Sequence, residues 1–166
     1  MAMDKFDKKL AIIGGGHIGQ ALAEGFINSG KICSSQLIIS NPSLEKLAHL
    51  SKQGVEITSG NTVAVKKADI IFLAVKPLIA GPVLREINNL IKGKTVISLA
   101  AVVSIKNLKK YAKNAEIVRI MPNMAVACNQ GVIGFFGNIR HKSEIIQLVS
   151  LLGSVVDVKK EEDLDS

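Results

Sequence analysis

The chain has 166 residues, which fits one domain with a single core, and its composition of 48% hydrophobic and 21% charged residues excludes a disordered protein. The net charge of +7 comes with only five Phe and one Tyr, too few aromatic residues for the stacking surface of a nucleic-acid-binding protein. No apolar run approaches the ~20 residues that span a membrane, and the two cysteines have no partners at metal-ligand spacing. We therefore expect a cytoplasmic protein with a small-molecule partner and with no metal, nucleic acid or membrane.

A glycine-rich turn stands near the start of the chain. Residues 1–9 form a charged N-terminal extension, Leu10–Ile13 predicts a buried strand, and apolar residues at helical spacing predict a helix over 17–28. Between them the glycines follow the pattern G-x-G-x-x-G, which in a strand–turn–helix directs the free N–H groups of the helix toward a pyrophosphate. A plain glycine-rich turn is the alternative, and the flanking strand and helix favour a dinucleotide site. The residues expected to hold the pyrophosphate are Gly14, Gly16, His17, Ile18 and Gly19.

Strands and helices alternate along the rest of the chain. Apolar runs predict strands at 36–40, 55–57, 69–75, 95–99, 116–121, 131–136 and 155–158. Helical spacing predicts helices from 44 to a stop at Gly54 and at 61–67, 77–91, 104–111 and 142–152. Residues 10–158 are thus expected to form a Rossmann-like α/β domain, with a doubly wound, mostly parallel sheet of about eight strands and helices on both faces. A charged tail at 159–166 is expected to be solvated.

Ligands of such sheets bind at the carboxyl ends of the strands. An NAD site usually has Asp or Glu after the second strand, but Ser40-Asn41-Pro42-Ser43 stands at that place. Hydroxyl, amide and backbone donors bind a 2′-phosphate and a carboxylate repels it, so we expect NADP(H) to be favoured over NAD(H). In the alternative interpretation, Asn41-Pro42 is only a turn.

The residues that follow the strands resemble the N-terminal domain of the pyrroline-5-carboxylate reductase family. The resemblance extends from Leu10 to Phe136 and more loosely to the end of the chain. It is carried by segments 12–21, 39–42, 69–77, 97–101 and 119–123, in which Ala-Val-Lys-Pro and Met-Pro-Asn are more specific than the glycines. It implies an NAD(P)H-dependent oxidoreductase of proline biosynthesis, which transfers hydride from NADPH to 1-pyrroline-5-carboxylate and so forms proline.

The resemblance also implies roles for individual residues. Ser40 and Asn41 would face the 2′-phosphate end of the cofactor, and Asn61 would contact the cofactor as well. No side chain stands out as a general acid: Lys76 is the nearest candidate, but a structural role for its segment is favoured, so the catalytic residue is unknown. The nicotinamide half would lie along Ala74, Val75, Lys76 and Pro77, with Ala101 where nicotinamide meets substrate and Asn123 as a substrate residue.

The chain departs from the family pattern at three places. Met124-Ala125 stands where Thr-Pro is common, and Val102 stands where Gly is frequent. A Val does not readily adopt a positive φ, so we expect a different turn there, and both differences bear on substrate specificity. Third, 162–165 resembles the lead-in to a helical C-terminal domain, absent here, which in the family forms the dimer interface and most of the imino-acid site.

This third departure leads to an expectation for the chain itself. We expect the 166 residues to bind NADPH with little or no turnover, and the full-length protein to be a homo-oligomer. Two other functions stay open. The same domain could belong to a reductase of another imine, a keto acid or a deazaflavin, or it could be a non-catalytic NADP-binding module.

Overall fold

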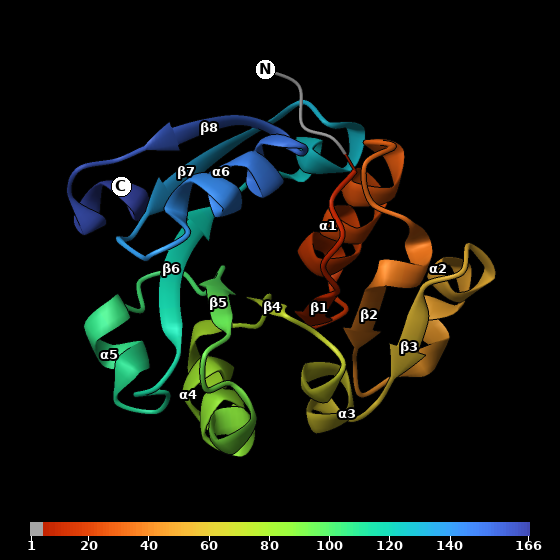
Figure 1. Ribbon diagram of the computed structural model, residues 1–166, viewed down its shortest axis with the longest axis horizontal. Helices are drawn as coiled ribbons and strands as arrows, with labels where there is room; N and C mark the ends of the chain where they lie inside the picture. The colour runs from red at the N-terminus through yellow and green to blue at the C-terminus, as the bar shows by residue number, and fades with distance from the viewer. Residues whose placement is uncertain (1–4) are drawn as a thin grey trace.

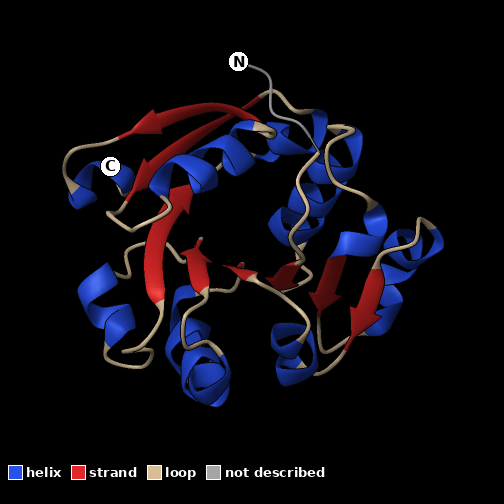
Figure 2. Cartoon of the chain, viewed as in Figure 1, coloured by secondary structure: helices blue, strands red, loops and turns tan. Residues whose placement is uncertain are grey.

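One eight-stranded sheet organises the molecule, in the order β3-β2-β1-β4-β5-β6-β7-β8 (Figures 1 and 2). The computed structural model describes residues 5–166, so residues 1–4 of the predicted extension lie outside it. Neighbouring strands are parallel except for the antiparallel pair β6–β7. The strands are β1 Leu10–Ile13, β2 Leu37–Ser40, β3 Glu56–Thr58, β4 Ile70–Leu73, β5 Thr95–Ser98, β6 Glu116–Met121, β7 Gly131–Phe136 and β8 Gly153–Asp157. The predicted doubly wound, mostly parallel α/β fold is confirmed.

Helices cover both faces of this sheet (Figure 1). The α-helices are α1 His17–Asn28, α2 Ala48–Lys52, α3 Asn61–Lys66, α4 Pro77–Ile87, α5 Ile105–Lys109 and α6 Lys142–Ser150. The 3₁₀ helices are η1 Ser34–Gln36, η2 Leu44–Leu47, η3 Asn88–Leu90, η4 Met124–Cys128 and η5 Glu161–Leu164. The predicted helix from 44 thus begins as a 3₁₀ turn, and the predicted helix 77–91 divides into α4 and η3. Among residues 5–166, no helix has the length and apolar character needed to cross a membrane.

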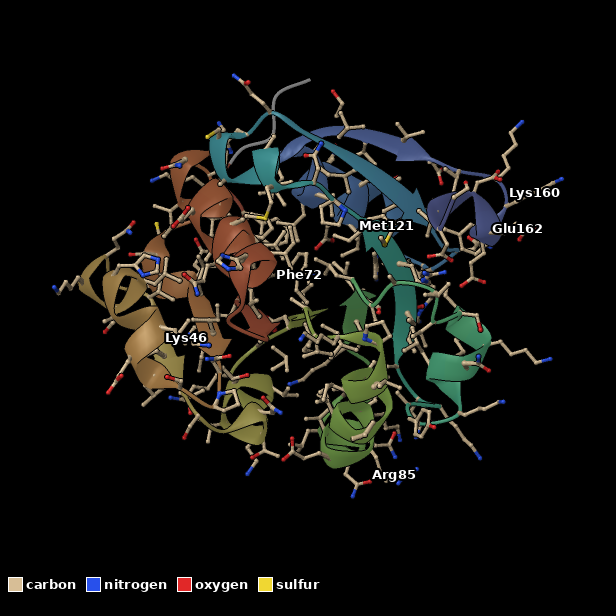
Figure 3. The ribbon with its side chains drawn as sticks, turned by 180° about the vertical axis from the view of Figure 1, so that it is seen from behind. Lys46, Phe72, Arg85, Met121, Lys160 and Glu162 are labelled. Atoms are coloured by element: carbon tan, nitrogen blue, oxygen red, sulfur yellow. The ribbon has the colours of Figure 1, made fainter. Side chains whose placement is uncertain are left out.

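The two faces of the sheet form two separate hydrophobic cores. Alternate residues of one strand enter opposite cores: Ile12 and Phe72 pack under α1 and α6, whereas Ile13 and Leu73 pack under α3 and α4. Phe72 lies at the centre of the molecule (Figure 3), with its ring centroid 5.4 Å from that of Phe26 on α1. Burial on both faces explains why the central strands are continuous apolar runs.

The prediction that 159–166 is a solvated tail is wrong for part of that segment. Lys160 and Glu162 are exposed and lie at the periphery of the molecule (Figure 3). Leu164, however, is only 7% exposed, and it packs on β7 at Gly134, where a Cβ would lie 2.8 Å from the Leu164 side chain. The carboxylates of Glu161 and Asp165 both bind Arg119 of β6. Composition alone pointed to solvent because it does not reveal that a buried guanidinium faces this segment.

Candidate cofactor-binding site

The turn between β1 and α1 requires glycine at two of its positions. Gly14 has a φ of +109°, and a Cβ there would lie 2.1 Å from the carbonyl oxygen of Ala74. A Cβ at Gly19 would lie 2.0 Å from the carbonyl oxygen of Gly14. The turn is thus pressed against the end of β4 and against its own helix. Only glycine fits both positions without moving the backbone.

Gly16 differs from the other glycines of the motif, because a Cβ there would meet nothing within 4 Å. It is the N-cap of α1 with a φ of −76°, a conformation open to any residue, and no side chain caps this helix end. Neither packing nor backbone strain therefore requires glycine at this position. The open space in front of uncapped N–H groups fits a pyrophosphate, whose close approach a side chain would hinder.

A cavity of about 430 Å³ opens at this turn, between the ends of β1 and β4. The order of the strands reverses there, since β1 lies between β2 and β4, and this is where doubly wound sheets bind ligands. The cavity brings together six of the predicted residues from two separate segments. It is lined by Gly16, His17, Ile18, Ala74, Val75, Lys76, Leu99 and Met124.

Leu99 and Met124 are the two lining residues that sequence reasoning did not assign to the site. Leu99 follows β5 directly, so the rule on strand ends includes it, although the predicted site residue is Ala101, two positions further on. Met124 opens the 3₁₀ helix η4, which carries no periodic signal. A Cβ at Gly25 of α1 would lie 2.2 Å from the Val126 carbonyl oxygen, so η4 is in close contact with α1. That contact places Met124 beside the glycine turn.

The residues after β2 form a hydrogen-bonded network at the adenosine end of the candidate site. Ser40 is fully buried, and its hydroxyl donates to Asn61 Oδ1 at 2.7 Å. The amide of Asn61 donates to the Glu86 carboxylate at 2.9 Å. Asn41 Oδ1 accepts from the Gly15 N–H at 3.2 Å, which connects this region to the glycine turn. Within the described residues these side chains hold one another, and no carboxylate follows β2 at positions 40–43.

Lys76, which lines the cavity, and three further predicted residues were given roles at the nicotinamide end. Lys76 is exposed and is the N-cap of α4, and within the described part of the chain its ammonium group has no ion-pair partner. Pro77, Ala101 and Asn123 do not line the cavity. Pro77 is the first residue of α4 and lies at a cleft between α4 and α5, and Ala101 is partly buried in the loop after β5. The Asn123 carboxamide oxygen accepts from the Val132 N–H at 3.3 Å.

No metal site accompanies the cavity within the part of the chain that the structure describes. Both cysteines, Cys33 and Cys128, are exposed and unbonded to each other. Residues 5–166 contain no group of three His, Cys, Asp or Glu side chains placed to hold a metal ion. The uncapped start of α1 and the open space at Gly16 can bind a phosphate-bearing ligand through backbone N–H groups, and the adjoining cavity can hold the remainder of that ligand.

Comparisons with known proteins agree with this geometry. Residues 9–102 match the model of a family described as NADP oxidoreductase coenzyme F420-dependent. The chain is 36% identical over 132 residues to pyrroline-5-carboxylate reductase 3 of Danio rerio, covering 78% of this chain and 46% of that protein. It is 37% identical over 129 residues to pyrroline-5-carboxylate reductase of Escherichia coli, covering 76% and 48%. The chain thus spans about half the length of these curated relatives.

Solved structures extend the similarity to almost the whole chain. A Plasmodium falciparum pyrroline carboxylate reductase with NADP bound matches with a TM-score of 0.87 and 28% identity, over 97% of this chain and 61% of that one. An Aspergillus terreus imine reductase, at 20% identity and a TM-score of 0.74, shares the fold. The resemblance to the pyrroline-5-carboxylate reductase family seen in the sequence is confirmed, over about half the length of the curated relatives.

Proposed function

The chain belongs to the family described as NADP oxidoreductase coenzyme F420-dependent, and we propose that it is the NADP(H)-binding part of a reductase of the pyrroline-5-carboxylate reductase type. One observation carries this proposal. The space in front of Gly16 is open, and it lies between an uncapped helix N-terminus and the cavity at the ends of β1 and β4. The names of the relatives suggest the substrate, 1-pyrroline-5-carboxylate.

In this proposal the backbone binds the phosphates and the cavity holds the nicotinamide end. The N–H groups at the start of α1 donate to the pyrophosphate, and no acidic residue stands in the first turn of that helix to oppose it. Ala74, Val75 and Leu99 form an apolar wall that excludes water from the nicotinamide ring. A bound NADPH supplies the hydride for reduction of an imine carbon, and the protein contributes position more than chemistry.

The region after β2 supports NADP(H) as the cofactor. No carboxylate stands where an NAD-selective site would place one, and Lys46, one helical turn further, is exposed and cationic. Because Ser40 and Asn41 use their side chains to hold the turn, we assign the phosphate contacts to the remaining amide proton of Asn41, to backbone N–H groups and to Lys46. The absence of a carboxylate at positions 40–43 is thus the main source of the proposed preference.

Separate titrations of the 166-residue chain with NADPH and NADH test the proposal. We expect saturable binding of NADPH, with a Kd at least about tenfold below that for NADH, which corresponds to about 1.4 kcal/mol. Equal affinities would remove the argument drawn from the end of β2. If neither nucleotide binds, the proposed function is wrong.

A further inference from the structure

Arg119 is a charged side chain buried inside the domain, with an exposed fraction of only 1%. It stands on β6, and its guanidinium forms a two-pronged pair with Asp165, at 3.1 Å from Nη1 to Oδ2 and 2.7 Å from Nη2 to Oδ1. Nη1 also donates to Glu161 Oε1 at 3.2 Å, and Nη2 donates to the carbonyl oxygen of Ala100 at 3.4 Å. Arg119 therefore joins two segments that are far apart in sequence, the β5–α5 loop (residues 100–105) and the 161–165 segment.

The two carboxylates that bind Arg119 also bind the backbone of the β5–α5 loop. Asp165 Oδ1 accepts from the Val102 N–H at 3.0 Å, and Glu161 Oε1 accepts from the Ile105 N–H at 2.7 Å. Leu164, buried against β7, anchors the segment between these two acids. Each acid thus connects the buried guanidinium with a backbone N–H group of the loop.

The loop has a conformation that its own sequence does not favour. Val102 has a φ of +58°, in the left-handed region that β-branched residues avoid. This corrects the expectation that a valine at this position would force a different turn. The Val102 side chain is 74% exposed, so packing does not hold it in place. Such a conformation persists only when its surroundings impose it. Here the loop is held by Asp165 at the Val102 N–H, by Glu161 at the Ile105 N–H and by Arg119 at the Ala100 carbonyl oxygen.

Stability alone is a poor explanation for this cluster. A buried ion pair often contributes no more than apolar residues of the same volume would, because removing the charges from water is costly. Within the described residues, Nε of Arg119 is buried with no hydrogen-bond partner, which adds to that cost. What the cluster does provide is a fixed geometry for the loop. That loop begins directly after Leu99, which lines the cavity at the ends of β1 and β4.

We propose that Asp165 and Glu161, held by Arg119, are positioning residues that keep the β5–α5 loop in its left-handed turn and so shape the nicotinamide end of the cavity. This proposal rests on the proposed function for the identity of the ligand. Its structural part, the holding of the loop, stands on the contacts alone. The segment between 161 and 165 then acts on the site without touching the cofactor.

Hydrogen exchange of the 166-residue chain without cofactor tests the structural part. We expect Asp165→Ala to speed exchange of the Val102 amide at least about tenfold, since its acceptor is lost, while the Phe72 amide in the core stays protected. Glu161→Ala removes the acceptor of the Ile105 N–H, so it should speed exchange of the Ile105 amide and leave the Val102 amide protected. The matched control is Glu162→Ala, which removes an exposed neighbouring carboxylate and should change neither amide. Unchanged exchange at Val102 in Asp165→Ala would overturn the proposal.

Titration with NADPH tests the effect on the site. We expect Asp165→Ala to raise the Kd for NADPH by about threefold to tenfold, and Glu162→Ala to leave it unchanged. Adding Val102→Gly to Asp165→Ala should restore most of the affinity, because glycine adopts the left-handed turn without help. A merely structural role for Asp165 predicts no such rescue, so absence of rescue would overturn the proposal. Failure of the unsubstituted chain to bind NADPH would instead refute the proposed function, and the exchange experiment would still decide whether the loop is held.

Discussion

Gly16→Ala isolates the contribution of the glycine turn to cofactor binding. In the structure the new Cβ meets nothing within 4 Å, and the backbone φ of −76° suits alanine. Alanine has fewer conformations than glycine in the unfolded chain, which would stabilise the variant by about 0.4–1 kcal/mol. Alanine is also a poorer N-cap than glycine by a similar amount, so the two effects on stability nearly cancel. We therefore expect the melting temperature to change by less than about 4 °C, since about 1 kcal/mol shifts it by about 2–4 °C at this size.

The same methyl group should strongly weaken cofactor binding. It occupies the space where the pyrophosphate would approach the backbone, so the phosphates must move away from the N–H groups of α1. We expect the Kd for NADPH to rise at least about tenfold, a loss of about 1.4 kcal/mol, by calorimetric titration.

Gly19→Ala provides the contrast. Its Cβ would lie 2.0 Å from the Gly14 carbonyl oxygen, a backbone atom that cannot move aside easily, so this variant should lose stability by more than about 2 kcal/mol. Unchanged NADPH affinity in a folded Gly16→Ala protein would refute the assignment of this turn to the pyrophosphate.

Three further changes test other parts of the molecule. Gly25→Ala would bring a Cβ within 2.2 Å of the Val126 carbonyl oxygen, so we expect a loss of about 2 kcal/mol or more in urea unfolding and a displaced η4. Asn41→Asp keeps the oxygen that accepts from the Gly15 N–H but adds a negative charge after β2, so the ratio of the NADPH Kd to the NADH Kd should rise about tenfold; an unchanged ratio would contradict the charge argument. The hydrogen bond from Arg119 lowers the pKa of Asp165 below its ordinary value of 3.8, so the unfolded chain takes up this proton first as the pH falls. The stability from this group is complete above about pH 4 and is lost as the pH falls through the lowered pKa, so urea midpoints should fall less steeply with acid in Asp165→Ala than in the unsubstituted chain.

The parts of the fold that the sequence could predict are those set by local pattern. The apolar run of β4 and the glycine spacing after β1 are patterns within a few residues, and the structure has the strand and the strand–turn–helix that they predict. Gly14, Gly16 and Gly19 carry the same letter in the sequence, yet their surroundings differ. Steric contact with Ala74 or with the turn itself requires glycine at the first and third positions, and open space distinguishes the second. The three-dimensional structure is needed to distinguish these two reasons for a glycine, steric contact and open space.

The parts that could not be predicted depend on contacts between distant segments. The left-handed turn at Val102 contradicts local preference, because a carboxylate 63 residues away accepts its N–H. The 3₁₀ helix η4 has no period to detect, and its position depends on close contact with Gly25 of α1, a contact that the helical spacing over 17–28 does not predict. The charged composition of 159–166 predicts a solvated tail, because the partner of Asp165 in this segment, Arg119, lies on a distant strand and leaves no local signal.

Local structure dominates the phosphate end of the proposed site, and contacts between distant segments dominate its nicotinamide end. The phosphate end is built mainly from one continuous turn whose conformation depends on its own glycines, with Ala74 and Asn41 as its contacts from other strands. The nicotinamide end collects Met124 from η4 and Leu99, which directly precedes the β5–α5 loop, and η4 and this loop are both held by distant segments. Substitutions that loosen these segments should therefore impair the position of the reacting ring while the phosphates remain bound. Cofactor affinity would then fall modestly, whereas the alignment needed for hydride transfer, which is sensitive to displacements of about 1 Å, would suffer more.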